Sequence, residues 1–361
     1  MDAIASINLR KGPIMKNKLN FFIIICTSLL LFATSALACT RAVYQGPDNL
    51  VVTARSMDWK DEIPANLWLF PRGMHRHGAV GPNSVTWTSK YGSIVTSAFD
   101  ISSTDGMNEK GLVANLLWLA ESTYPKYGSD KKGLSVAAWV QYVLDNFATV
   151  EEAVEELSAE SFVVVSSDIP GTGRFATLHL SISDAKGDNA IFEYIDGELV
   201  IHHSMSYTVM TNSPAFEQQL ALNEYWKQIG GLTMLPGTNR AVDRFVRASF
   251  YMDAIPRTSD PRVAIASTFS VIRNASVPFG ISSEKEPNIS STRWRSVSDQ
   301  KNLVYYFETA LTPNTFWVDL KKVDFNKNKP VRRLLLENHE VYAGNALNKF
   351  EVSDPFLFAG L

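Results

Sequence analysis

One cysteine stands where the chain could acquire a nucleophile. Cys39 lies in the stretch TSALACTRAV, directly after the small residues Ala36-Leu37-Ala38. A cysteine at the first position of a mature chain carries both a thiol and its own α-amine, whose ordinary pKa of about 7.7–8.0 suits it to accept a proton near neutral pH. Cleavage before Cys39 would therefore place a nucleophile and a base in the same residue.

Two other interpretations of Cys39 stay open beside this one. The first is a small residue without a role, although exported proteins rarely keep an exposed free thiol. The second is a lipid attachment point, because a lipoprotein signal also ends directly before a cysteine. Leu37 lies one place too close to Cys39 for a good signal of that kind, so we favour the nucleophile.

The residues before Cys39 have the composition of a secretory signal peptide. Lys16 and Lys18 precede an apolar run over residues 21–32, and the small residues before Cys39 form an A-x-A cleavage site. We expect residues 1–38 to be removed and the protein to be periplasmic or secreted; residues 1–14 read as an upstream extension, because Met15 begins a compact signal by itself. No later stretch reaches about 18 consecutive apolar residues, so stable membrane insertion is not expected.

The composition and charge of the mature chain limit its partners. The chain is 45% hydrophobic and 20% charged, which predicts a folded globular protein. Without residues 1–38 it keeps 30 basic and 36 acidic residues, a net charge of -6, which argues against nucleic acid or an anionic membrane surface as a partner. Cys26 leaves with the signal peptide, so Cys39 has no internal disulfide partner.

Charged residues that could tune the Cys39 thiol follow in the stretch NLVVTARSMDW. This apolar, β-branched run predicts a strand that ends near Arg55, with Asp58 just beyond it. If the strand that carries Cys39 turns into this one, Arg55 comes close to the thiol and can favour the thiolate. The alternative for Arg55 and Asp58 is an ion pair at the surface.

Several sequence blocks resemble one family. CTRAVY, ARSMDW, DGMNEKGL, YTVMTNSPAF, DRFVRASF and STRWRSVSDQKNLVYYFET appear in an order that is similar to the choloylglycine hydrolases, which include bile salt hydrolases and penicillin V acylases. These are N-terminal nucleophile hydrolases. The resemblance implies an α+β fold, a four-layer αββα sandwich, and hydrolysis of a linear amide.

The resemblance assigns a role to each of five residues. It implies that Cys39 is the nucleophile, that Arg55 contacts the thiol and that Asp58 orients the amine. It also implies that Asn212 stabilises the oxyanion and that Arg244 is a second active-site arginine. The alternatives are that Asn212 starts a turn before Ser213-Pro214 and that Arg244 packs along a helix.

One position departs from the pattern of the bile salt hydrolases. Those enzymes carry an asparagine that helps the oxyanion site, and an ungapped count places Trp118 there, with Asn115 out of register. Trp118 can still offer its backbone N–H, while its indole makes the acyl pocket flatter and more apolar; Trp59 is the other candidate wall. This similarity is to the acylases of Gram-negative bacteria.

Periodicity and turn signals predict the elements that would position these residues. We expect one catalytic domain over residues 39–361, because no repeat or Pro/Ser-rich linker divides the chain. Strands alternate with turns, and separate helices lie between two groups of strands, which favours a layered α+β sandwich. The predicted helices cover residues 135–144, 150–159, 214–227 and 240–251, with an antiparallel meander over residues 161–204 and final strands over residues 302–310 and 315–320.

The histidines do not form a convincing metal site. His75 and His77 alternate without a carboxylate or cysteine at zinc-like spacing, and the adjacent His202 and His203 would point oppositely on a strand. We therefore expect no metal and no organic cofactor.

The family's known amides leave the substrate open. We favour an acylase on penicillin V or N-acyl homoserine lactones, with a conjugated bile salt hydrolase as the alternative. A non-catalytic exported binding protein, or a lipid-anchored one, is the alternative of another class. The resemblance also implies a small-molecule amide as the partner and a homo-oligomer, a tetramer.

Overall fold

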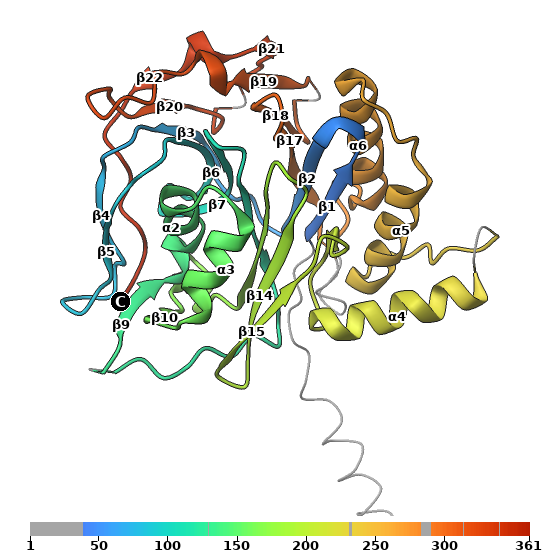
Figure 1. Cartoon of the computed structure of the whole chain (residues 1–361), viewed down its shortest axis with the longest axis horizontal. Coiled ribbons are helices and arrows are strands. Elements are labelled where there is room, and N and C mark those ends of the chain that lie inside the picture. Colours follow the sequence, from blue (N-terminus) through green and yellow to red (C-terminus); the bar gives the residue numbers. More distant parts are fainter. Residues whose placement is uncertain (1–38, 129, 231–232, 283–289, 313, 339) are drawn as a thin grey trace, which may run out of the picture. The chain divides into compact units, whose positions relative to one another are not determined.

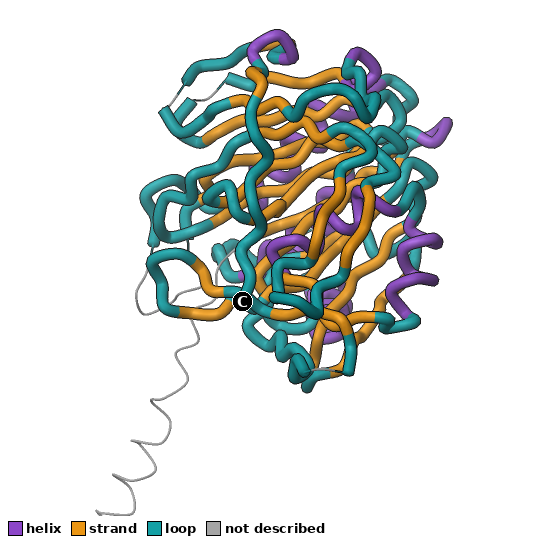
Figure 2. The backbone as a smooth tube through the Cα atoms, turned by 90° about the vertical axis from the view of Figure 1, so that its left-hand side faces the viewer, coloured by secondary structure: helices purple, strands orange, loops and turns teal. Residues whose placement is uncertain are grey.

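The structure, a computed structural model, describes residues 39–361 apart from 129, 231–232, 283–289, 313 and 339. The predicted signal peptide, residues 1–38, lies outside the described residues. Two large sheets lie at the centre of the described chain (Figure 1). Their strands run in similar directions in the view of Figure 2.

The first sheet has seven strands and begins with Cys39. Its spatial order is β16-β1-β2-β17-β18-β19-β21, and the pairs from β16 to β19 are antiparallel. Its strands are β1 (Cys39–Gln45), β2 (Val51–Asp58), β16 (Val209–Met210), β17 (Thr292–Asp299), β18 (Val304–Thr309), β19 (Phe316–Asp319) and β21 (Gly344–Asn345).

The second sheet has nine strands in the order β15-β14-β13-β8-β7-β6-β3-β20-β22. It contains the meander β13-β14-β15 and ends with two strands from the C-terminal part of the chain. Its strands are β3 (Leu67–Phe70), β6 (Ser93–Ala98), β7 (Ser102–Asn108), β8 (Val113–Trp118), β13 (Leu178–Ser183), β14 (Asn189–Ile195), β15 (Glu198–His203), β20 (Arg332–Leu334) and β22 (Glu351–Val352).

Helices cover the outer face of each sheet. α5 (Ala241–Ala254) and α6 (Pro261–Ala275) pack on β1 and β2, and α4 (Phe216–Ile229) packs on α5. The 3-10 turn η2 (Val136–Ala138), α2 (Trp139–Asn146) and α3 (Val150–Ser158) cover the nine-stranded sheet. This is the predicted four-layer αββα arrangement, in which apolar faces of both sheets are buried between layers.

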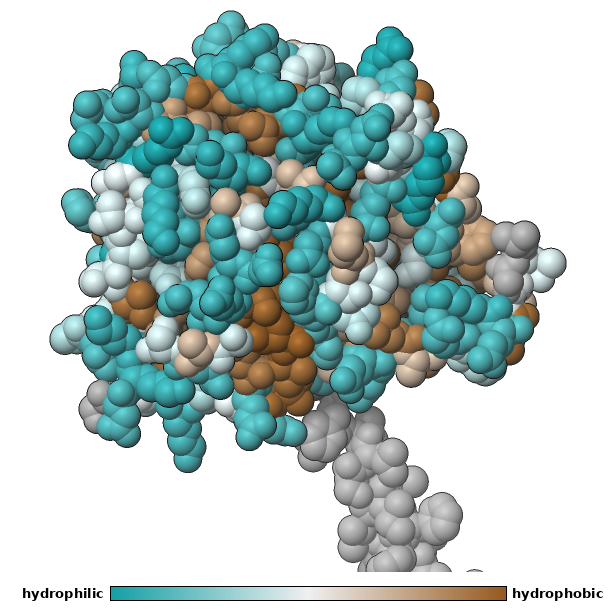
Figure 3. Space-filling view, viewed as in Figure 1, coloured by the Kyte–Doolittle hydropathy of each residue, from teal (hydrophilic) through white to brown (hydrophobic). Residues whose placement is uncertain are grey.

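Local signals explain where several helices begin. Thr149 accepts a hydrogen bond from Glu152 N at the start of α3, as its position before an acidic first turn predicts. Asp260 caps α6, and Pro261 occupies its first turn. None of the helices among the described residues has the length and apolar character that a membrane crossing needs. Hydrophilic residues cover most of the face in Figure 3, around one hydrophobic patch in its lower middle.

Two elements were not predicted, and two expectations about the elements were wrong. Helix α6 and strand β17 were not predicted, although Asp260-Pro261 is a helix start signal. The segment β10 (Phe162–Val165) pairs in parallel with β9 (Lys132–Ser135) and is therefore no part of the antiparallel meander. The predicted start of the helix at residue 135 is too early, because Ser135 ends β9 and caps η2 instead.

Candidate active site

Cys39 is the first residue of β1 and lies at one end of a pocket. Its side chain is buried, and Cys39 Sγ lies 3.8 Å from Met57 Sδ and 4.0 Å from Asp58 O. Burial raises the pKa of the thiol above its ordinary value, and the positive charges of Arg55 and Arg244 oppose that shift. The thiol therefore needs a base to become a nucleophile at neutral pH.

Arg55 lies on the strand next to Cys39 and on the same face of the sheet. Cys39 is opposite Met57 in the register of β1 and β2, so alternation along β2 places Arg55 and Met57 on the face that carries the thiol. Arg55 Nη2 lies 3.8 Å from Met57 Sδ and donates to Leu116 O at 2.6 Å. The guanidinium is fully buried between the two sheets and approaches Asp105 Oδ2 at 3.8 Å.

Asp58 lies on the other face of β2, toward α5. Asp58 Oδ1 accepts a hydrogen bond from Thr292 Oγ1, and Asp58 Oδ2 lies 3.6 Å from Arg244 Nη1. Burial raises the pKa of Asp58 to about 6, although Arg244 opposes that shift. The alternative of a surface ion pair between Arg55 and Asp58 is wrong, because both are buried and each faces another partner.

The Cys39 nitrogen contacts Asn212 rather than the Asp58 carboxylate. Cys39 N donates to Asn212 Oδ1. In the full chain this nitrogen is a peptide nitrogen with one hydrogen, so the contact with Asn212 uses its whole donor capacity. The amine-orienting role of Asp58 stays a prediction for the cleaved chain.

Arg244 connects the residues around the nucleophile. Its Nη1 donates to Cys39 O at 2.7 Å and to Thr40 Oγ1, and its Nη2 donates to Asn212 Oδ1 at 3.0 Å. Asn212 Nδ2 in turn donates to Trp118 O at 2.8 Å. Asn212 follows β16 directly, and Arg244 lies in the first turn of α5, so a strand end and a helix start meet at Cys39. The structure thus brings all five predicted site residues together.

Sequence reasoning missed one buried carboxylate beside the site. Asp105 lies between the sheets, accepts hydrogen bonds from Tyr305 Oη and from Asn115 Nδ2 at 2.5 Å, and faces Arg55. Asn115, which the ungapped count left out of register, therefore holds this carboxylate. Asp105 opens the quoted block DGMNEKGL, so the block itself was the signal that could have identified it.

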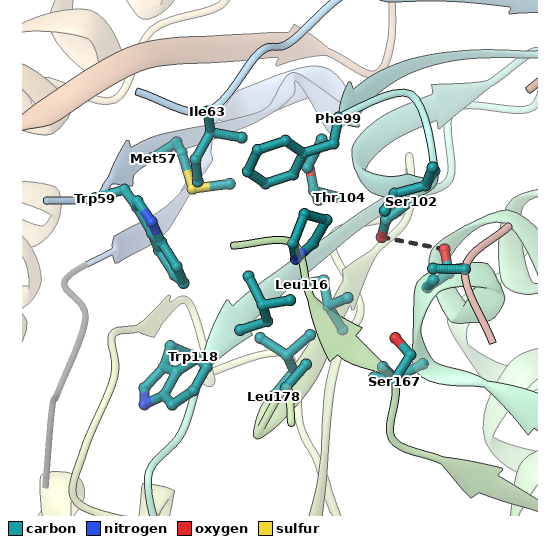
Figure 4. A pocket seen from close by; sticks show the side chains of 18 of the residues that line it. Met57, Trp59, Ile63, Phe99, Ser102, Thr104, Leu116, Trp118, Ser167 and Leu178 are labelled. Atoms are coloured by element: carbon teal, nitrogen blue, oxygen red, sulfur yellow. Dashed lines mark hydrogen bonds between the residues drawn. The ribbon is translucent and has the colours of Figure 1, made fainter. Parts of the chain in front are cut away.

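The pocket beside Cys39 is apolar and two tryptophans line it. Trp59 and Trp118 both line it, with ring centroids 6.1 Å apart in an edge-to-face arrangement. The cavity has a volume of about 100 Å³. Figure 4 shows Trp59, Met57 and Trp118 at one side and Ser102 and Ser167 at the other, with Leu116 and Leu178 between them.

The histidines that were considered as metal ligands contact other residues instead. His75 Nδ1 bonds Thr88 Oγ1 on the exposed face of β4 (His75–His77), while the buried His202 approaches Glu193 and the exposed His203 approaches Asp188. The described residues contain no group of three or more His, Cys, Asp or Glu side chains with the geometry to hold a metal.

Comparisons with known proteins agree with this site. A model of the linear amide C–N hydrolases, choloylglycine hydrolase family, matches residues 39–333. The chain is 55% identical over 358 residues to a penicillin V acylase from Pectobacterium atrosepticum, covering 92% of this chain and 95% of that protein. A bile salt hydrolase/transferase from Clostridium perfringens is 27% identical over 319 residues, covering 81% and 95%.

A solved structure extends the similarity to the fold. A penicillin V acylase from Agrobacterium tumefaciens superposes with a TM-score of 0.85 at 60% identity, covering 90% of this chain and 100% of that chain. The family match begins at Cys39, the residue that the site geometry places at the pocket. The chain is thus an amidohydrolase of non-peptide C–N bonds in linear amides and belongs to the choloylglycine hydrolase family.

Proposed function

We propose that the protein is an exported acylase that uses Cys39, freed by removal of residues 1–38, to hydrolyse amides with an aromatic or fatty acyl group. One observation carries this proposal: the Cys39 thiol opens into an apolar pocket without a side-chain base at its sulfur. The described contacts of Sγ are a thioether and a carbonyl oxygen. The α-amine that cleavage creates supplies the missing base.

The reaction follows from the positions of these groups. The Cys39 amine takes the thiol proton, and the thiolate attacks the amide carbonyl to form a C–S bond. Asn212 Nδ2 and a backbone N–H stabilise the oxyanion. The amine then protonates the leaving nitrogen as the C–N bond breaks, and water releases the acid from the thioester. Arg55 and Arg244 stabilise the negative charges that form during the reaction, and Asp58 orients the amine.

The pocket favours narrow acyl groups over a steroid. Its volume of about 100 Å³ is small, and Trp59 and Trp118 give it flat, apolar walls. A phenoxyacetyl group or a straight chain suits such a space better than four fused rings. Two penicillin V acylases among the relatives support the same substrate class. We therefore place penicillin V and N-acyl homoserine lactones before conjugated bile salts.

A panel of amides tests the activity. Purified mature protein is assayed against penicillin V, glycocholate and N-acyl homoserine lactones, with Cys39→Ser as the control. We expect turnover of penicillin V or of the lactones, and loss of turnover in the control. Turnover of glycocholate alone would favour the bile salt hydrolase, and binding without turnover of any amide would favour the binding protein. Activity that survives Cys39→Ser would contradict nucleophilic catalysis by Cys39.

Mass spectrometry of the exported protein tests the processing step. The uncleaved chain has its Cys39 nitrogen in an amide and therefore has no base. We expect a periplasmic or secreted chain that begins with unmodified Cys39. A thioether-linked lipid on Cys39 would instead support the lipid-anchored alternative, and a mature chain with another first residue would contradict the mechanism. We also propose a homo-oligomer, a tetramer, and light scattering of the same sample tests it.

A further inference from the structure

The acyl pocket ends at the last residues of the chain. Ala359 lines the pocket together with Ile101, Ser102 and Ala137. Ser102 Oγ donates to Ala137 O, the bond drawn in Figure 4 on the side away from the two tryptophans. An acyl group that enters beside Cys39 and extends past Leu116 therefore meets the C-terminal segment at the far end.

Main-chain hydrogen bonds hold this segment in place. We call residues 355–361 the C-terminal tail; it follows β22, the last strand of the nine-stranded sheet. Ala359 N donates to Ile101 O at 2.8 Å, Ala359 O accepts from Ser135 Oγ, and Leu361 N donates to Ala79 O at 3.1 Å. Figure 1 shows the C terminus beside β9, where Ser135 lies.

Alternate side chains of the C-terminal tail anchor it to the sheet. The Phe356 ring packs edge-to-face on Trp68 at 5.2 Å and on Phe70 at 5.7 Å. The Phe358 ring lies 5.6 Å from the Arg76 guanidinium. Leu357, between these two phenylalanines, is 78% exposed. This alternation is that of an extended segment with one face docked.

The end of the C-terminal tail packs closely against Ala79. A Cβ atom on Gly360 would lie 1.5 Å from Ala79 O, which is far inside contact distance. Glycine is therefore the residue that permits this approach. With hydrogen bonds on both sides of Gly360, the C-terminal tail is a fixed wall of the pocket.

The wall lies outside the part of the chain that matches the family. The family model matches residues 39–333, which include Cys39, Arg55, Asp58, Asn212 and Arg244. The C-terminal tail begins after that match ends. The residues for the chemistry thus lie inside the matched range, and the residue that closes the pocket lies after it.

We propose that the C-terminal tail sets the greatest length of acyl group that the pocket accepts, with Ala359 as the specificity-determining residue. The proposal rests on the proposed function, because it assigns a substrate property to the same site. A methylene that a pocket cannot hold lowers kcat/KM by about 10–200-fold. Activity should therefore fall sharply at one acyl length, and a change at the wall should move that length.

Three variants of the full chain test this role. Ala359→Phe adds bulk at the wall, Gly360→Ala forces the tail away from Ala79, and Leu357→Phe places the same new ring at an exposed position as the matched control. The kcat/KM of each mature protein is measured on N-acyl homoserine lactones from butanoyl to dodecanoyl. In Ala359→Phe we expect the drop in kcat/KM to begin at a shorter acyl chain, with about tenfold or more lost for each methylene that no longer fits. In Gly360→Ala we expect the drop to begin at a longer chain. Leu357→Phe should match the wild type.

Other outcomes separate this proposal from the proposed function. If the wild type hydrolyses the series but Ala359→Phe and Leu357→Phe keep the same length profile, the role of the tail is wrong and the acylase stands. If the wild type hydrolyses no amide, the proposed acylase activity is wrong. The length limit is then measured by the binding of straight-chain carboxylic acids to Cys39→Ser, with tryptophan fluorescence as the signal. A limit that Ala359→Phe leaves unmoved in that assay overturns the proposal. Melting temperatures check that each variant is folded.

Discussion

Two of the buried charged clusters in the described part of the chain differ in their surroundings: the first opens into the acyl pocket and the second does not line it. The Cys39 cluster (Cys39, Arg55, Asp58, Asn212 and Arg244) lies at the start of β1 beside the acyl pocket. The Asp145 cluster (Arg76, Trp87, Gln141 and Asp145) lies between α2 and the short strands β4 and β5 (Thr86–Thr88). Both contain an arginine and a carboxylate that are almost fully buried.

The clusters differ in the contacts of their central groups, the Asp145 carboxylate and the Cys39 thiol. Asp145 accepts from Trp87 Nε1 at 2.8 Å and from Gln141 Nε2 at 2.8 Å, and lies 3.0 Å from Arg76 Nε. In the Cys39 cluster the thiol has only a sulfur and a distant carbonyl as described contacts, and it faces the pocket. Burial and charge alone therefore do not mark a reactive site; a reactive group that keeps free capacity toward a cavity does.

Replacing Cys39 should give the largest effect, a great loss of activity with little loss of stability. We expect Cys39→Ser to lower kcat/KM by about 10⁴-fold or more, since removal of a nucleophile that works with its base costs most of the acceleration. The free energy of unfolding should change by less than about 1 kcal/mol, because the substitution removes little volume. Kinetics and denaturant unfolding on the same samples measure both. A large loss of stability would show that the thiol is mainly a packing group.

Replacing Asp145 should give the opposite result. Asp145→Asn leaves the buried Arg76 without a counter-charge, and breaking such a pair costs about 3–5 kcal/mol of stability. The activity of the protein that remains folded should be unchanged on the shortest acyl amide, because Asp145 does not line the pocket. Denaturant unfolding and active-site titration with a thiol reagent separate the two quantities. Unchanged stability would contradict the structural role of this cluster.

Asn212 tests whether the Cys39 cluster stabilises charge in the transition state. Removing one oxyanion donor typically lowers kcat by about 10²–10³-fold, so we expect Asn212→Ala to lower kcat in this range and to change KM little. Steady-state kinetics on penicillin V give both constants. A rise in KM with an unchanged kcat would instead assign Asn212 to substrate binding.

The two clusters also show what the sequence could reveal. The Cys39 residues were predicted because each lies in a short block that resembles the choloylglycine hydrolases, and Cys39 also follows an A-x-A cleavage site. The Asp145 cluster joins β4, β5 and α2, and no local pattern reports a contact between segments so far apart.

The same limit applies to the fold. Strands β1, β2 and the meander follow from apolar, β-branched runs and turn residues, whereas the parallel pair β9-β10 depends on a contact between distant segments. The C-terminal tail was not predicted for a similar reason, because its docking depends on Trp68, Phe70 and Ala79 far earlier in the chain.

Asp58 should give the smallest effect, a dependence of the protein's stability on pH. Its folded-state pKa of about 6 lies above the ordinary 3.8, so the folded chain holds a proton in this range that the unfolded chain has released. The free energy of unfolding should therefore fall as the pH rises through this window, by up to about 3 kcal/mol at about 1.4 kcal/mol per pKa unit.

Comparison with Asp58→Asn isolates this contribution, because the amide does not titrate. Denaturant unfolding of both chains is measured from about pH 4 to pH 7, and we expect the stability of the wild type relative to Asp58→Asn to decrease across that range. A relative stability that increases with pH would mean that Arg244, 3.6 Å away, outweighs burial and holds the carboxylate ionised. The sign of this slope thus decides whether burial keeps the Asp58 carboxyl protonated or Arg244 holds it ionised.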